Sequence, residues 1–140
     1  MTTVLLIMYR QLMSDALIRS LSGSLKFKFY RDQSYRQAVI ATQTYNPDIT
    51  LVEIPENKAY QPEDYLIICD DVKSVRPECK LMLMCPENSD ESRQAAVEAM
   101  RSGRIDDFIY YNVSMDYLES KLDVLSAGYS NHKKADEREA

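Results

Sequence analysis

The sequence predicts an α/β fold in which a five-stranded parallel sheet is covered by helices on both faces. Short apolar runs alternate in strict order with longer segments of helical period, from residue 3 to about residue 125. The central runs, such as 3–8 and 79–85, are apolar almost throughout, which is typical of strands covered on both faces. Strict alternation implies right-handed crossovers, and these make the strands parallel. A chain of 140 residues, 45% of them hydrophobic, suits one domain.

The first half of the chain contributes three strands and two helices. The strands are predicted at 3–8, 25–30 and 48–54, and the helices over 10–21 and 34–45. In the first helix one face is formed by Met13, Ala16, Leu17 and Leu21. The second strand alternates apolar and basic residues, as a strand near a sheet edge does. The second helix ends at Asn46, because a residue that precedes proline is disfavoured in the α region.

The second half contributes two strands and three helices. The strands are predicted at 79–85 and 106–111. The helices are predicted over 61–75, from a start at 88–91 to residue 102, and over 115–125. Pro62 suits the first position of a helix, where its missing N–H is tolerated. A sequence that resembles a capping box opens the fourth helix, and Gly103 is its expected C-cap. The domain is therefore predicted at 1–126, and the polar segment 127–140 is predicted to be a flexible tail or a truncated linker.

Composition and charge argue against several classes of protein. The formal net charge is −5 without a dense Lys/Arg cluster, so we expect no nucleic-acid binding by this domain itself. No apolar run approaches the roughly 18 residues of a membrane span, and no basic leader suggests a signal peptide. Cys69, Cys79 and Cys85 favour reduced thiols in the cytoplasm. Without CxxC spacing, and with His132 as the single histidine, no zinc site is expected.

Four segments at predicted strand ends resemble response-regulator receiver domains. They are "LLIMYRQLMSDAL" at 5–17, "PDITLVEIP" at 47–55, "KLMLMCPEN" at 80–88 and "GRIDDFIYYNVSMDYL" at 103–118. In the family these are the first strand and helix, the strand of the phosphorylated aspartate, the strand of the switch hydroxyl, and the final strand. The resemblance covers residues 2–126. It implies a flavodoxin-like, doubly wound (βα)5 fold in three layers and a role in two-component signalling.

The residues that differ from the family are those that carry its chemistry. Receivers close the first strand with two acids that hold Mg²⁺, where this chain has Met8 and Tyr9. Glu53 stands in place of the phosphorylated aspartate, and Cys85 in place of the switch threonine or serine. Tyr111 stands in place of the family's lysine. The resemblance therefore implies a degenerate receiver.

These replacements predict that the phosphoryl-transfer chemistry is lost. Mg²⁺ prefers several oxygen ligands in octahedral geometry, and one glutamate supplies too few. Without metal and lysine, nothing neutralises the charge on a transferring phosphoryl group. We therefore expect no phosphorylation of Glu53, no metal, no cofactor and no catalytic residue. The rim is expected to hold a solitary carboxylate with no cation or ammonium beside it.

Glu53 has three interpretations. It is a mimic of the phosphorylated acid, a ligand for an unrecognised partner, or a solvated acid at a strand end, and we favour the last. A buried glutamate would need a partner, since an unpaired buried charge is costly. Tyr9, Tyr111 or Arg10 could supply that partner.

Two further residues of the rim have a functional and a structural interpretation. Cys85 is either a redox sensor or a small buried thiol, and we favour the thiol, because acids at the start of the next helix oppose a thiolate. Phe108 lies at the position of the family's switch aromatic. Without its trigger, we favour an ordinary aromatic residue at a strand end.

The preferred function is a regulatory module that acts by protein–protein interaction. The family commonly associates through its fourth helix, fifth strand and fifth helix, here about 90–125. Candidate interface residues on this surface are Met100, Arg101, Tyr110 and Tyr117. We expect a homodimer or another protein partner.

Two other functions are open alternatives. One is a working phosphoryl-accepting receiver, which could form the N-terminal part of a transcription regulator. The other is a small enzyme or cofactor binder on the same fold. A flavodoxin needs a phosphate-binding loop after the first strand, where "YRQLMSD" offers none. A dinucleotide fold needs glycines there, and the chain has three in all.

Overall fold

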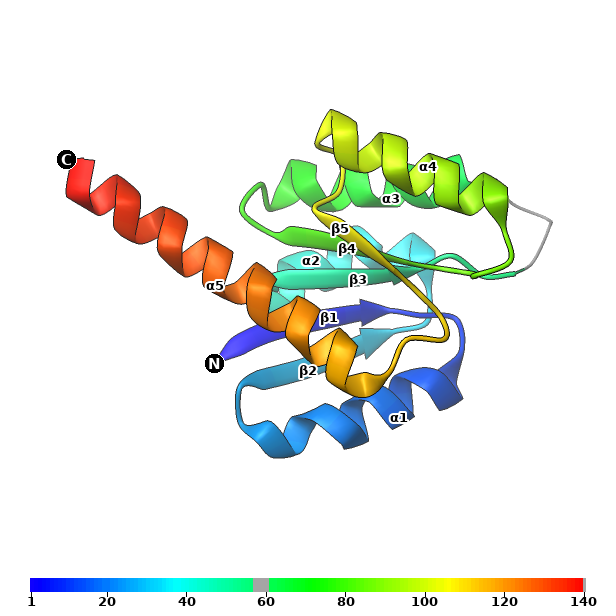
Figure 1. Ribbon diagram of the computed structural model, residues 1–140, viewed down its shortest axis with the longest axis horizontal. Helices are drawn as coiled ribbons and strands as arrows, with labels where there is room; N and C mark the ends of the chain where they lie inside the picture. Colours follow the sequence, from blue (N-terminus) through cyan, green and yellow to red (C-terminus); the bar gives the residue numbers. More distant parts are fainter. Residues whose placement is uncertain (57–60, 140) are drawn as a thin grey trace.

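Five parallel strands form one sheet in the order β2-β1-β3-β4-β5, as the alternation of the sequence predicts (Figure 1). The computed structural model describes residues 1–56 and 61–139, with side chains described up to residue 127. The strands are β1 (Thr2–Ile7), β2 (Phe27–Asp32), β3 (Ile49–Glu53), β4 (Lys80–Cys85) and β5 (Asp107–Tyr110). The helices are α1 (Gln11–Leu21), α2 (Ala38–Tyr45), α3 (Pro62–Val75), α4 (Asp90–Ser102) and α5 (Met115–Glu139).

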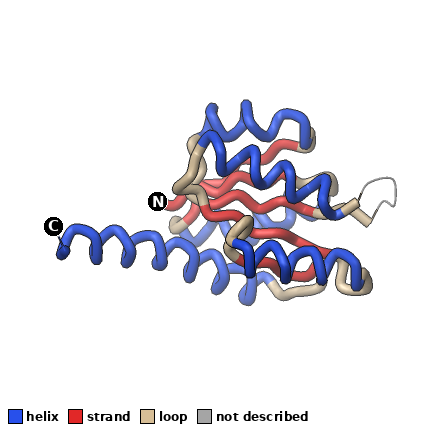
Figure 2. Tube along the Cα trace, turned by 90° about the horizontal axis from the view of Figure 1, so that it is seen from above, coloured by secondary structure: helices blue, strands red, loops and turns tan. Residues whose placement is uncertain are grey.

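Helices cover both faces of the sheet, so that the core has two halves (Figure 2). Successive residues of a strand point to opposite faces. In β1 and β3, Leu5 and Val52 pack with α2, α3 and α4, whereas Leu6 and Leu51 pack with α1 and α5. This two-sided burial explains why the central strands are apolar almost without interruption, and it confirms the predicted flavodoxin-like fold.

Helix ends follow the predicted capping chemistry. Pro62 is the first residue of α3, and α4 is capped by Ser89, whose hydroxyl accepts the N–H of Ser92 at 3.2 Å. Gly103 ends α4 with φ 80°, a left-handed conformation that glycine adopts without strain. Ser114 accepts the N–H of Tyr117 at 3.1 Å at the start of α5. These caps set the loops that lead into and out of the carboxyl edge of the sheet.

Several boundaries and one helix face differ from the predictions. Strand β2 starts at Phe27 rather than residue 25, because a 3₁₀ turn and left-handed Leu25 (φ 60°) follow α1. On α1, Ala16 is exposed and Ser14 is buried in its stead, with its hydroxyl bonded to the carbonyl of Gln11 at 3.0 Å. The backbone of α5 is helical to Glu139, beyond the predicted 115–125. The domain boundary at residue 126 stays a prediction.

Candidate functional site

The candidate site lies at the carboxyl edge of the sheet, where β1, β3 and β5 end. Ligands of open α/β sheets bind at this edge. The turn after β1 carries Met8, Tyr9 and Arg10, β3 ends in Glu53, and Tyr111 follows β5 directly. Sequence reasoning named this group of strand ends, and the structure brings Tyr9, Arg10, Glu53 and Tyr111 into one cluster.

Glu53 is fully buried and fully bonded. Its side chain has 0% exposure, and its Oε1 accepts the backbone N–H groups of Tyr9 at 2.8 Å and Arg10 at 3.0 Å. Its Oε2 forms an ion pair with Nε of Arg10. The interpretation of Glu53 as a solvated strand-end acid is therefore wrong, and so is the expectation of a rim without a cation. Of the three partners named for a buried Glu53, which were Tyr9, Tyr111 and Arg10, the structure gives Arg10 as the cation and Tyr9 as a backbone N–H donor.

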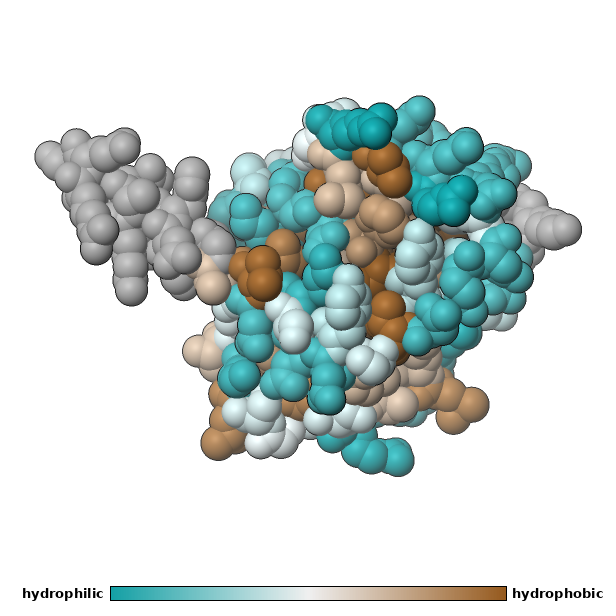
Figure 3. Space-filling view, in the orientation of Figure 1, coloured by the Kyte–Doolittle hydropathy of each residue, from teal (hydrophilic) through white to brown (hydrophobic). Residues whose placement is uncertain are grey.

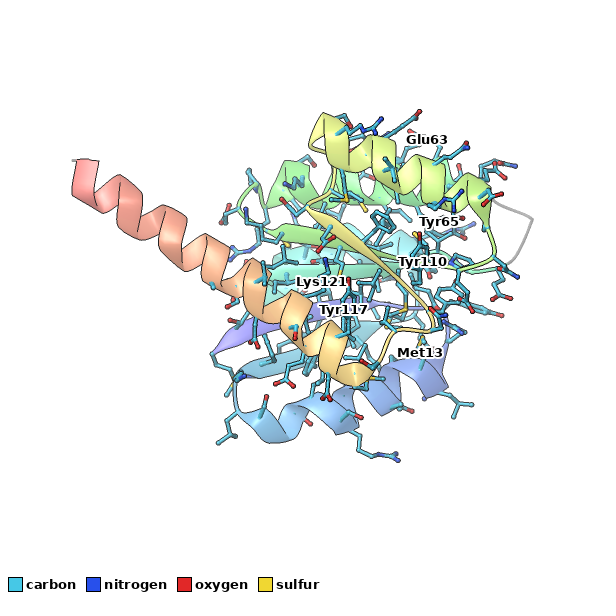
Figure 4. The ribbon with its side chains drawn as sticks, viewed as in Figure 1. Met13, Glu63, Tyr65, Tyr110, Tyr117 and Lys121 are labelled. Carbon is cyan, nitrogen blue, oxygen red and sulfur yellow. The ribbon has the colours of Figure 1, made fainter. Side chains whose placement is uncertain are left out.

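The Arg10 guanidinium is held on three sides. Besides its ion pair with Glu53, its Nη2 lies 2.8 Å from Sδ of Met13, a residue near the start of α1 (Figure 4). Its Cζ lies 3.9 Å from the centroid of the Tyr111 ring. An arginine over an aromatic face gains a cation–π attraction. The side chain remains 38% exposed, so one side of the cluster meets solvent.

Two tyrosines close the cluster from the side of the β3 backbone. Tyr35 donates its hydroxyl to the carbonyl of Glu53 at 2.7 Å, and Tyr111 donates its hydroxyl to the carbonyl of Ile54. Burial, and then the charge of Glu53, raise the pKa of both phenols above its ordinary value. Both therefore stay neutral hydrogen-bond donors. Sequence reasoning missed Tyr35 as a site residue; it lies in the 3₁₀ turn Tyr35–Gln37, directly before α2.

The two positions that hold acids in receivers do not form a ligand set here. Met8 is buried in the core half beneath α1 and α5, whereas Tyr9 is 64% exposed. The described part of the chain contains no group of three or more His, Cys, Asp or Glu side chains that could hold a metal ion. A single carboxylate already engaged by Arg10 is a poor magnesium ligand, since Mg²⁺ needs several free oxygens.

Cys85, at the end of β4, is a buried thiol. Its exposure is 0%, and burial raises the pKa of its thiol to about 12. At neutral pH the sulfur is therefore protonated and a weak nucleophile. This geometry favours the structural interpretation over a redox sensor. Phe108 is half-buried, packs against the core and meets the Tyr110 ring edge-on at 5.7 Å. Its role as an ordinary aromatic residue stays a prediction.

A groove of about 580 Å³ runs along β5 between α4 and α5. Its lining includes three of the four predicted interface residues, Met100, Tyr110 and Tyr117, whereas Arg101 is exposed on α4 outside that lining. Lys121 bonds Asp107 at 3.0 Å and lies 5.5 Å from the Tyr117 ring (Figure 4). Apolar side chains form a strip across this face in Figure 3. Three of the four predicted residues thus line one groove, and their role as an interface stays a prediction.

Comparison with known proteins identifies the fold. No family model matches the sequence, and no curated protein matches it. A response regulator from Thermotoga maritima matches with a TM-score of 0.73 at 15% identity, over 89% of this chain and 96% of that chain. A two-component response regulator from Clostridium difficile gives 0.73 at 18% identity, over 91% and 97%. NtrX from Brucella abortus gives 0.80 at 18% identity, over 97% of this chain and 28% of that chain. The fold is the flavodoxin-like fold of response-regulator receiver domains.

Removing the Arg10 side chain should destabilise the protein. An Arg10→Ala substitution leaves the buried Glu53 carboxylate without its cation, and we expect a loss of about 2–3 kcal/mol in the free energy of unfolding. Urea denaturation followed by circular dichroism measures this loss. Arg93→Ala is the matched control, because Arg93 makes an exposed ion pair with Asp90 at 3.0 Å and should lose less than about 1 kcal/mol. Equal losses in the two variants would contradict a special role for Arg10.

Alkaline pH should weaken the fold through the buried thiols. Burial raises the pKa of Cys85 and Cys69 to about 12, from an ordinary 9.0. Below pH 9 these thiols are protonated in both the folded and the unfolded protein, so their contribution to stability is full. It is lost as the pH rises towards 12, because the thiols ionise in the unfolded protein before they ionise in the folded one. Each thiol should lower the free energy of unfolding by about 1.4 kcal/mol per pH unit above 9. Urea denaturation at pH 8 and 10.5 tests this, and Cys85→Ala should flatten the dependence. A dependence as steep as that of the wild type would contradict it.

Proposed function

We propose that this protein is a cytoplasmic signalling module of the receiver type that acts by docking to protein and takes no phosphoryl group on Glu53. The observation that carries the proposal is the buried ion pair between Glu53 and Arg10. The ion pair supports a signalling role that depends on the receiver fold and on a docking surface. Phosphoryl transfer, the usual chemistry of this fold, is not needed for that role.

Three features of Glu53 argue against its acting as a phosphoryl acceptor. The carboxylate has 0% exposure, so an incoming phosphodonor cannot reach it without rearrangement. Both oxygens are engaged, one by the N–H groups of Tyr9 and Arg10 and one by the Arg10 guanidinium. The neighbouring Met8 and Tyr9 bring no carboxylate for Mg²⁺, which in phosphoryl transfer neutralises the developing charge.

The groove along β5 is the docking surface that we propose. Met100, Tyr110 and Tyr117 supply flexible and aromatic side chains, the types that anchor protein interfaces. Arg101 on α4 and Asp116 on α5 are both exposed and carry opposite charges. A homodimer is the partner we favour, because a two-fold axis through the groove would bury its apolar and aromatic side chains against the same side chains of a second copy.

The oligomeric state and its dependence on the groove test the docking proposal. The wild type should elute with about twice the chain mass of 16.2 kDa in size-exclusion chromatography with light scattering. Tyr117→Asp and Met100→Glu should each yield the monomer, because each buries an unpaired charge in the interface. Leu12→Glu is the control, since Leu12 is exposed on α1, away from the groove. A monomeric wild type, or charged groove variants that dimerise as the wild type does, would refute the homodimer.

Incubation with acetyl phosphate and Mg²⁺ tests the absence of phosphorylation. We expect intact-protein mass spectrometry to find no added phosphoryl group, because Glu53 is buried and paired. A working receiver domain run in parallel is the positive control for the reagent. An acyl phosphate on Glu53 would establish the alternative function, a phosphoryl-accepting receiver.

A further inference from the structure

We propose that the cluster around Glu53 is a guanidinium-binding site that Arg10 fills from within, and that its occupancy holds the β5–α5 turn, and so the groove, in one conformation. The proposal rests on the proposed function only in giving that groove a role. Arg10 then supplies permanently, from within the chain, the positive charge that a metal ion would bring to such a site. The surface would then be presented without a small-molecule trigger.

The walls of the site match the parts of a guanidinium group. The Glu53 carboxylate meets Nε, the sulfur of Met13 lies 2.8 Å from Nη2, and the Tyr111 ring lies 3.9 Å below Cζ. A planar, delocalised and weakly hydrated cation can satisfy all three at once. An ammonium is a compact, strongly hydrated charge and cannot stack on the ring while it reaches the sulfur. The site therefore selects a guanidinium over an ammonium.

Glu53 makes occupancy of the site necessary. Its Oε1 is satisfied by two backbone N–H groups, whereas Oε2 has Arg10 as its partner. With Arg10 absent, the carboxylate would lose its cation and keep only the two backbone N–H donors at Oε1. An empty site is thus unfavourable, and any cation of suitable shape in solution should be drawn to it.

Tyr111 connects the site to the groove. Its ring lies against Arg10, its hydroxyl donates to the carbonyl of Ile54, and its N–H donates to the carbonyl of Cys85 at 3.0 Å. These three contacts fix the residue that directly follows β5 and precedes the turn into α5. Tyr110, which precedes Tyr111 and is the last residue of β5, lines the groove. Loss of the guanidinium removes one of the three contacts and should loosen the turn.

Chemical rescue tests the site. Arg10→Ala should melt about 10 °C below the wild type. Methylguanidinium at about 10 mM should raise the melting temperature of this variant by a few degrees, through binding to the folded state. Methylammonium at the same concentration should raise it less, because it lacks the planar group. The wild type, whose site is full, and the Arg10→Ala/Glu53→Gln double variant, which lacks the charge, should not respond. The absence of rescue in a folded Arg10→Ala protein, or an equal response in the double variant, would overturn the proposal.

Hydrogen exchange tests the connection to the groove. Amides 110–114 should exchange faster in Arg10→Ala than in the wild type, and methylguanidinium should slow them again. Arg93→Ala should leave them unchanged. Arg10→Lys keeps the positive charge and serves as a second test if Arg10→Ala does not fold. The Arg10→Lys protein should melt below the wild type, and its amides 110–114 should exchange faster. An Arg10→Lys protein identical to the wild type in both measurements would overturn the selection for guanidinium.

These outcomes are separable from those of the proposed function. A wild-type dimer whose Arg10→Ala variant shows no rescue would leave docking in place and remove the guanidinium site. Rescue in a protein that is monomeric throughout would keep the guanidinium site and remove the homodimer.

Discussion

The buried charge of Glu53 is the constraint on which the rest of the site depends. A carboxylate with 0% exposure at the end of a central strand needs a cation, and this chain supplies it from its own β1–α1 turn. The ion pair joins β1 to β3, and the stacking of Arg10 on Tyr111 extends the connection to β5. Through these two interactions, Arg10 ties together three strand ends that, in a phosphorylated receiver, would meet around a metal ion.

The same interaction explains how a site without clustered carboxylates can coexist with a well-formed fold. Mutual burial of β1, β3 and β4 beneath helices on both faces supplies the core, and none of that packing needs an acid at the strand ends. The carboxyl edge is then free to change its chemistry, provided that each buried polar group finds a partner. Glu53, Tyr35 and Tyr111 all do so within the described part of the chain. Away from this cluster, the groove along β5 presents aromatic and apolar side chains to solvent.

The fold was predictable from the sequence because the central strands are buried on both faces and read as apolar runs, and because Pro62, Ser89 and Gly103 mark helix ends by local chemistry. The start of β2 could not be predicted, because Leu25 adopts a left-handed conformation that leucine rarely takes. The positions of Glu53 and Tyr111 were predictable from strand ends alone. The sequence could name Arg10 as one of three possible partners of Glu53 but could not choose among them, because only the tertiary fold brings Glu53 and Tyr111 within reach of its guanidinium.

The most direct test of the central claim is a titration of the ¹⁵N-labelled protein with Mg²⁺, followed through the backbone amides of Tyr9, Arg10 and Glu53. The first two donate to the Glu53 carboxylate and would sense any ion that displaced Arg10 from it. If Arg10 fills the site, these amides will keep their chemical shifts throughout the titration, with and without beryllofluoride. A saturable shift of all three, with release of the Arg10 side chain, would contradict the claim that this edge of the sheet carries its own cation.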